Sequence, residues 1–180
     1  PHAGSAVGDI ITTAVQQPEG HYLIKGTKQF ITSGSTADLA LIFATTDPDA
    51  PRGKGISGFI VPTDTPGYTV DRIENKMGLK ASDTCVISLD SVEVPFENRL
   101  GEEGQGYKIA LSNLEGGRIG IGAQAIGIAR AELEAALDYA RERHTFGVPI
   151  SDHQAVAFRL ADMATVLEAA RQLVFYAARL

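Results

Sequence analysis

Short apolar stretches broken by turn-forming residues make up the first hundred residues of the chain. Stretches rich in Val, Ile, Thr, Phe and Tyr alternate with Gly, Pro, Asp and Asn, which is the pattern of strands and turns. The pattern predicts strands at residues 8–16, 21–33, 38–46, 57–62, 68–74 and 84–94. Because no helical segment separates them, these strands indicate an antiparallel β-barrel or β-sandwich.

The second predicted strand contains the stretch KGTKQFITSG, in which charged and hydroxyl residues surround an aromatic side chain. Tyr22, Ile24 and Phe30 have one parity and are expected on one face of the strand. Lys25 and Lys28 are interpreted as solvated charges. From the residues alone, Phe30 is a core side chain.

A long helix is predicted after Gly104. The pattern continues to Arg143 without proline, and such a helix would measure about 60 Å. Each glycine inside it costs up to about 1 kcal/mol relative to alanine. Such a cost indicates close approach to another helix or to a ligand, and for Gly122 and Gly127 another helix is the favoured interpretation.

A second helix is predicted after the stretch HTFGVPI, with Ser151 or Asp152 as its cap. Its apolar stripe consists of Val156, Leu160, Met163, Leu167 and Val174. The short connection predicts an antiparallel pair. Two helices bury only part of their apolar faces, so the pair requires more chain or another subunit. The fold class is therefore α+β, an antiparallel barrel or sandwich followed by part of an antiparallel helical bundle.

Composition narrows the possible partners. The 180 residues carry a formal net charge of -6, with the basic residues scattered, which argues against a nucleic-acid partner. No apolar run approaches the roughly 20 residues of a membrane span, and no signal-peptide pattern is present, so a cytoplasmic protein is expected. The single cysteine, Cys85, is interpreted as a buried apolar side chain. The four histidines do not form a metal-ligand pair, and no metal is predicted.

Six motifs together carry a family resemblance. They are PHAGS, GTKQFITSG, KMGLKASDT, SVEVPFENRLG, GRIGIGAQAIGIA, and ERHTFG followed by HQA. Their order and spacing resemble the acyl-CoA dehydrogenases, short-chain members in particular, over essentially the whole chain. The resemblance implies a middle β domain at residues 1–100 and the first two helices of the C-terminal bundle at 101–180, within a longer protein. One position departs from the family pattern, since Ala6 stands where an acidic residue usually follows Gly-Ser.

The resemblance implies FAD as cofactor. Its ring would lie against the end of the second strand, with the Thr32 hydroxyl bonded near flavin N5. The implied FAD contacts are Ser5, Phe30, Ile31, Thr32, Arg143, His144, Thr145, His153 and Gln154. The contacts from Arg143 onward would reach the flavin of a neighbouring subunit, which implies a homotetramer. From the residues alone, Thr32 is a strand residue and Arg143 a cation at a helix C-terminus.

The resemblance also implies an acyl-CoA substrate and a place in fatty acid metabolism. The implied substrate contacts are Ser5, Glu115, Gly116, Gly117 and Arg118. Some family members carry the catalytic glutamate immediately before the arginine that matches Arg118, where this chain has Gly117. No catalytic residue is therefore expected in this chain. The base is expected on a later, C-terminal segment, with Arg118 supporting it.

The reaction implied is α,β-dehydrogenation of an acyl-CoA to the trans-2-enoyl-CoA, with electrons passing to an electron-transferring flavoprotein. Two alternatives stay open. One is a flavin oxidase or monooxygenase on the same scaffold. The other is a non-catalytic module of β-barrel and helices that serves assembly or ligand binding.

Overall fold

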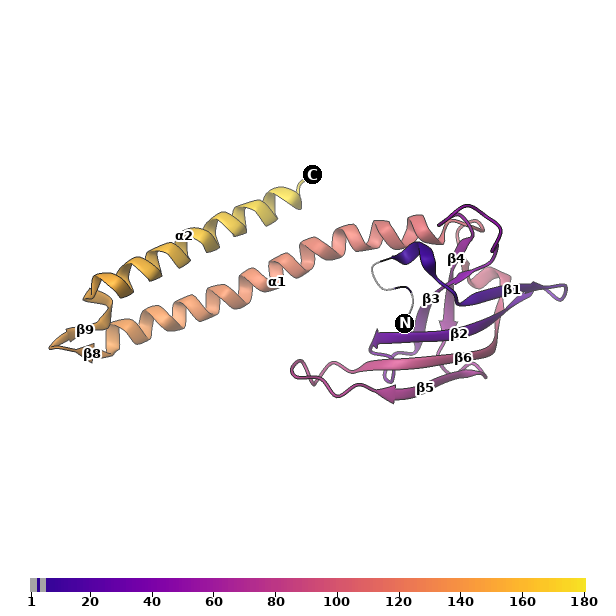
Figure 1. The fold of residues 1–180 in the computed structure, drawn as a ribbon, viewed down its shortest axis with the longest axis horizontal. Helices are drawn as coiled ribbons and strands as arrows, with labels where there is room; N and C mark the ends of the chain where they lie inside the picture. Colours follow the sequence, from indigo (N-terminus) through magenta and orange to yellow (C-terminus); the bar gives the residue numbers. More distant parts are fainter. Residues whose placement is uncertain (1–2, 4–5) are drawn as a thin grey trace. The chain divides into compact units, whose positions relative to one another are not determined.

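The structure of the protein, a computed structural model, describes residue 3 and residues 6–180. The chain forms two compact units, one that ends at Leu111 and one that covers Ser112–Leu180. The first unit holds a β-sheet and the second a pair of helices, as Figure 1 shows. In the described part of the chain, no helix is apolar and long enough to cross a membrane.

The sheet of the first unit has seven strands in the order β5-β6-β2-β1-β3-β4-β7. The strands are β1 (Thr13–Gln17), β2 (His21–Thr32), β3 (Leu39–Thr45), β4 (Ile56–Pro62), β5 (Tyr68–Ile73), β6 (Thr84–Pro95) and β7 (Arg99–Leu100). All six predicted strands are present. The first begins later than predicted, because Val7–Asp9 form the 3-10 turn η1 instead. A second 3-10 turn, η2, covers Phe96–Asn98.

The α+β class is confirmed, but the sheet is neither wholly antiparallel nor a closed barrel. β1 pairs with β3 in parallel, through Thr13 and Thr45, and every other strand pair in the sheet is antiparallel. The short strands β5 and β7 form the two edges. β1 pairs with β2 only as far as Lys25, so among the described residues β6 is the only strand that pairs with the second half of β2.

One face of the sheet carries the hydrophobic core. The ring of Tyr22 lies 4.9 Å from that of Phe59 and 5.0 Å from that of Phe96. Cys85 is fully buried in the same cluster, as predicted. The buried cluster consists of Ala14, Tyr22, Ile24, Ile42, Ala44, Phe59, Val61, Cys85, Ile87, Leu89, Val92 and Val94. Burial of each large side chain contributes about 1.5 to 3 kcal/mol, so this face holds the strands in register.

β2 departs from regular geometry near its end. Lys28 pairs with Ile87 and Ile31 with Cys85, so β2 has one residue more than β6 across this interval. This is a β-bulge, which leaves the extra residue unpaired. Phe30 lies in the bulge with φ 60 and is 66% exposed. The prediction that Phe30 shares the core face is therefore wrong, because the bulge breaks the two-residue alternation.

The helical unit consists mainly of two long helices, α1 (Gly106–Glu142) and α2 (Gln154–Ala177), and the first turns of α1 belong to the first unit. A short hairpin of β8 (His144–Thr145) and β9 (Val148–Pro149) joins them, followed by the 3-10 turn η3 (Ile150–Asp152). Phe146 and Gly147 form the hairpin loop with φ 53 and 87. Positive φ at both loop residues is the geometry of a type I′ turn.

Of three details of the helical prediction, one is confirmed and two are corrected. Ser151 and Asp152 lie in η3 rather than at the cap; the N-cap of α2 is His153, and its side chain makes no capping hydrogen bond. Gly122 faces the partner helix as expected, since a Cβ there would lie 3.1 Å from Val174 Cγ2. Gly127 does not, because no described atom lies within 4 Å of a Cβ built there.

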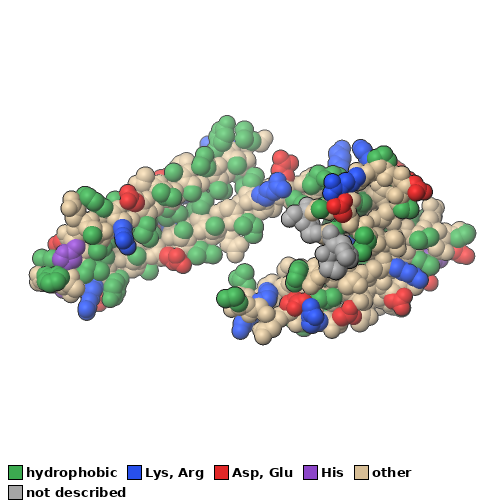
Figure 2. Space-filling view, viewed as in Figure 1, with side chains coloured by type: hydrophobic (Ala, Val, Ile, Leu, Met, Phe, Trp, Pro, Cys, Tyr) green, Lys and Arg blue, Asp and Glu red, His purple; other side chains and the backbone are tan. Residues whose placement is uncertain are grey.

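The two helices leave much apolar surface uncovered. Within Ser112–Leu180, all of which the structure describes, only Leu133 and Ala140 are fully buried. Figure 2 shows hydrophobic side chains at the surface along both helices. Exposed apolar side chains include Ile121, Ile128, Phe158, Val166, Leu173 and Phe175.

Lys28 is not the solvated charge that the sequence suggested. Its side chain is partly buried, and Nζ donates a 2.6 Å hydrogen bond to the carbonyl oxygen of Phe43 on β3. Lys28 lies beyond Lys25, the last residue of β2 that pairs with β1. Desolvation lowers the pKa of Lys28 to about 8. Lys25, three residues earlier on the same strand, is exposed as expected.

The pKa of Lys28 predicts a pH dependence of stability. Because the folded-state pKa lies below the unfolded value, the unfolded state binds more protons between the two values, and stability rises with pH across that window. The cost of burying the charge is fully present below about pH 8. Relative to Lys28→Met, the wild-type protein should gain about 1 to 2 kcal/mol between about pH 7 and pH 9.5.

Urea unfolding of the two proteins at both pH values measures this gain. Lys25→Met is the matched control and should show no such difference from the wild type, since Lys25 is exposed. Equal pH dependence of wild type and Lys28→Met would contradict the assignment.

Candidate functional site

The end of β2 presents an aromatic ring and a hydroxyl to solvent. Phe30 is 66% exposed, while its neighbour Ile31 packs against the core cluster. Thr32 is exposed, and its hydroxyl makes no hydrogen bond to any residue that the structure describes. The structure thus brings together the three residues expected at the flavin ring, with Ile31 as the anchor.

The conformation of Phe30 is strained. A bulky residue in the left-handed region costs about 1 to 2 kcal/mol, and the core does not compensate here because the ring points outward. Strain of this kind collects at binding and catalytic sites. Phe146 in the β8–β9 loop repeats the feature, with φ 53 and 97% exposure. Both aromatic residues lie in motifs that carried the family resemblance.

The segment before β1 is fastened to a loop of the sheet. Arg52 donates two hydrogen bonds of 2.7 Å, from Nε and Nη2, to the two carboxylate oxygens of Asp9. This fork geometry is the stronger form of an arginine–carboxylate pair. Ser5, expected to contact both flavin and substrate, lies outside the described residues.

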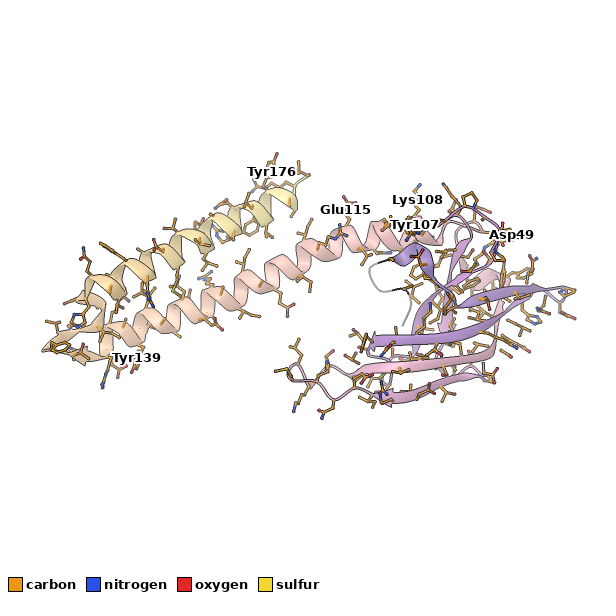
Figure 3. All side chains as sticks on the ribbon, viewed as in Figure 1. Asp49, Tyr107, Lys108, Glu115, Tyr139 and Tyr176 are labelled. Carbon is orange, nitrogen blue, oxygen red and sulfur yellow. The ribbon has the colours of Figure 1, made fainter. Side chains whose placement is uncertain are left out.

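The predicted substrate segment lies on α1 and is open. Glu115, Gly116, Gly117 and Arg118 are all exposed, and Glu115 projects from the helix in Figure 3. No described atom lies within 4 Å of a Cβ built at Gly116 or Gly117. Arg118 makes no ion pair or hydrogen bond within the described part of the chain, which leaves its guanidinium free for an external anion.

The residues expected at the FAD diphosphate gather around the end of α1. Arg143 and His144 line a shallow hollow of about 420 Å³ together with Tyr139 and Glu142. Tyr139 marks this position in Figure 3. The imidazole of His144 is oriented by a 2.9 Å hydrogen bond between Nδ1 and the Glu142 carbonyl oxygen. The exposed guanidinium of Arg143 suits a phosphate group, which it can bind through two parallel hydrogen bonds.

The other expected diphosphate contacts lie on the β8–β9 hairpin and the start of α2. Thr145 Oγ1 and His153 Nε2 are 2.8 Å apart and share a hydrogen bond, and the ring of Phe146 meets His153 edge-on at 6.1 Å. Gln154 is the exposed first residue of α2. This cluster belongs to the second unit, and the Phe30–Thr32 segment belongs to the first.

Two polar residues around the β2 end escaped the sequence reasoning. Lys28 supports the strand just before the bulge, through its bond to Phe43. Asp83, in the quoted motif KMGLKASDT, accepts hydrogen bonds from the turn that follows Thr32. Asp83 could have been found from the sequence, because it lies in a family motif to which no role had been assigned. Nothing in the alternation of β2 distinguished Lys28 from Lys25. The burial of Lys28 depends on the residue of β2 at which pairing with β1 stops.

Comparisons with known proteins agree on one family. The model of the acyl-CoA dehydrogenase middle domain matches residues 1–92, and the model of the acyl-CoA dehydrogenase C-terminal domain matches residues 104–180. An acyl-CoA dehydrogenase of Bacillus subtilis is 53% identical over 180 residues, which are 100% of this chain and 47% of that protein. A short-chain specific acyl-CoA dehydrogenase of Megasphaera elsdenii is 46% identical over 99% of this chain and 46% of its own length.

Solved structures show the same fold. The butyryl-CoA dehydrogenase of Megasphaera elsdenii superposes with a TM-score of 0.94 at 45% identity, covering 98% of this chain and 46% of that one. The sheet and helical pair therefore have the fold of the matching part of that structure. The chain belongs to the acyl-CoA dehydrogenase family. It spans about half the length of the curated relatives that it matches, 47% of the Bacillus subtilis protein.

The strain at Phe30 predicts an inverted preference for glycine. In an ordinary strand alanine is more stable than glycine by roughly 0.5 to 1 kcal/mol. At φ 60 the order should reverse, so Phe30→Gly should be more stable than Phe30→Ala by about 1 kcal/mol in urea unfolding of the full-length protein. The same pair of substitutions at Val15, an exposed residue of β1, is the control and should keep the ordinary order. A more stable alanine at position 30 would show that the left-handed conformation is not kept.

Proposed function

We propose that the whole protein containing this chain is an FAD-dependent acyl-CoA dehydrogenase. The observation that carries the proposal is the end of β2, where a strained, exposed aromatic ring stands beside a threonine hydroxyl that has no hydrogen-bond partner among the described residues, within the family motif. The Thr32 hydroxyl can donate a hydrogen bond to the polar edge of a flavin ring, and the exposed ring of Phe30 can pack against a flat heterocycle.

The roles of the FAD contacts follow from their chemistry. Thr32 would donate to the flavin near N5, Phe30 would pack against the ring, and Ile31 would fix the segment to the core. When bound, FAD supplies the acceptor for the hydride that leaves the β carbon of the acyl group. Arg143 and His144 would hold the diphosphate in the hollow by Tyr139, with Thr145, His153 and Gln154 beside them on the connecting hairpin.

The substrate role belongs to the exposed face of α1. Gly116 and Gly117 leave room for the acyl-CoA, and Ser5 is proposed to meet it from the β unit. Arg118 would stabilise the carboxylate that removes the α proton. That carboxylate is proposed to come from outside these residues, because position 117 has no side chain and Glu115 is displaced by about 200° around the helix. Removal of the α proton becomes easier as hydrogen bonds stabilise enolate charge on the thioester oxygen.

Partners and assembly extend the proposal. An electron-transferring flavoprotein is proposed as electron acceptor, supported by relatives named for such complexes, including the CarC subunit of the caffeyl-CoA reductase–Etf complex of Acetobacterium woodii. A homotetramer and a role in fatty acid metabolism are proposed on the family alone. The rat relative is named as mitochondrial, while a cytoplasmic location stays a prediction for this chain. The boundary between the two domains is proposed near residue 100.

An oxidase on the same scaffold is the second candidate. A solved prolyl acyl carrier protein oxidase superposes with a TM-score of 0.94 at 36% identity. The experiment that separates the candidates adds butyryl-CoA to the full-length protein without air. Flavin absorbance should bleach, and reoxidation should be fast with electron-transferring flavoprotein and slow with oxygen. Absence of bleaching would refute the dehydrogenase, and rapid peroxide formation in air would favour the oxidase.

The position of the base gives a separate prediction. Glu115→Gln in the full-length protein should leave the rate of flavin reduction by butyryl-CoA within about threefold of wild type, because Glu115 takes no proton. Stopped-flow absorbance measures the rate. Glu132→Gln, another exposed glutamate of α1, is the control for loss of a surface charge. Loss of flavin reduction in Glu115→Gln alone would make Glu115 the base.

A further inference from the structure

The turn that follows Thr32 is held by one carboxylate. Asp83 Oδ2 accepts 2.8 Å hydrogen bonds from both the backbone N–H and the hydroxyl of Ser35, and a 3.1 Å bond from the Cys85 thiol. The carbonyl oxygen of Asp83 also accepts a bond from the Ser33 N–H. Asp83 therefore joins the turn after β2 to the start of β6 through both its side chain and its backbone.

The fit of this turn is tight. Gly34 lies against Cys85, and a Cβ built on Gly34 would approach Cys85 Cβ to 2.7 Å. Ser33 has φ 58, a conformation that its own side chain does not favour. A turn with a strained residue persists only when surrounding interactions hold it. Here the bonds to Asp83 tie the turn to the start of β6, and the Thr36 and Ala37 N–H groups donate further bonds to the Ser33 carbonyl oxygen within the turn.

The orientation of Thr32 depends on the backbone on both sides of it. On one side is the bulge with Phe30, and on the other is the turn that Asp83 holds. Thr32 itself pairs with Thr84, the residue next to Asp83. The backbone is thus irregular on both sides of Thr32. Regular strand pairing alone therefore does not fix the direction of the Thr32 hydroxyl.

We propose that Asp83 is a positioning residue that holds Thr32 and Phe30 in place for the flavin, acting through Ser35 and Cys85. The proposal rests on the proposed function of the same site. The Ser35 N–H, then the Cys85 thiol and the Ser35 hydroxyl, keep the pKa of Asp83 below its usual range, so the group is an anion at neutral pH. A charged acceptor makes stronger hydrogen bonds than a neutral one.

The test uses full-length protein and measures FAD affinity and the flavin midpoint potential. Asp83→Ala should weaken FAD binding about tenfold, the loss expected for charge-assisted hydrogen bonds. Asp83→Asn, which keeps one acceptor oxygen, should recover most of the affinity. Ser35→Ala, which removes only the hydroxyl, should move both quantities in the same direction by less. Asp90→Ala is the matched control, since Asp90 lies on β6, which Asp83 immediately precedes, and accepts a 3.2 Å bond from an adjacent serine, Ser91.

Coupling to Thr32 separates positioning from general stability. Thr32→Val should shift the flavin potential in the wild-type background, and the shift should fall to less than about half in the Asp83→Ala background, because residues that act through one another are not additive. Additive shifts would overturn the proposal. If Asp83→Ala does not fold, the same comparison is made with Ser35→Ala and Asp83→Asn.

The outcomes distinguish this proposal from the function on which it rests. If the protein binds FAD but butyryl-CoA does not bleach it, the proposed function is wrong, and the coupling between Asp83 and Thr32 still decides the positioning role. If butyryl-CoA bleaches the flavin and the two substitutions act independently, only the positioning role is wrong. A wild-type protein that binds no FAD overturns both.

Discussion

The pairing of β2 with β6 is the constraint on which the candidate site depends. β2 loses β1 as a neighbour after Lys25, so within the part of the chain that the structure describes its last residues pair with β6 alone. Main-chain hydrogen bonds to one neighbouring strand leave the other edge of β2 unpaired. Side-chain hydrogen bonds hold this part of the strand instead. Lys28 reaches the carbonyl of Phe43 on β3, and Asp83 holds the turn after Thr32. Between these two contacts lies the bulge that turns Phe30 outward.

This arrangement explains why a partly buried lysine is tolerated. Desolvation of an ammonium group is costly, and a single carbonyl bond does not remove the cost, as the lowered pKa of Lys28 shows. An apolar side chain at position 28 would avoid it, yet would not bind the Phe43 carbonyl across the gap that β1 leaves. The lysine therefore trades stability for a fixed strand end, which is the usual balance at a binding site.

The sequence predicted what depends on local pattern. Alternation and turn residues located six strands, and the unbroken pattern after Gly104 located α1 to within a few residues of its observed bounds. It failed where long-range contacts decide. From the residues alone, alternation predicts Phe30 in the core because parity assumes a strand without bulges, whereas the family resemblance predicts it at the flavin. Alternation also predicts Lys28 in solvent, because the residue at which β1 stops pairing with β2 cannot be read from the sequence of β2. The open, partly parallel sheet was missed for the same reason. β1 and β3 are neighbours in the sheet, although β2 separates them in the sequence. The motifs, by contrast, identified the family, because their order and spacing along the chain do not depend on predicting the local conformation.

The glycines of α1 serve two different purposes. Gly122 is explained by packing, since Val174 of α2 approaches it closely, and a larger residue would separate the helices. Gly116, Gly117 and Gly120 have no described atom within 4 Å of a built Cβ, so packing within these units does not compensate for their propensity cost of up to about 1 kcal/mol each. Arg118 lies among them, permanently charged and without a partner in the described residues. A bare helix face next to an unpaired guanidinium is suited to a bulky ligand and a carboxylate that both come from elsewhere, and this is the arrangement that an acyl-CoA and a base on a later segment would require.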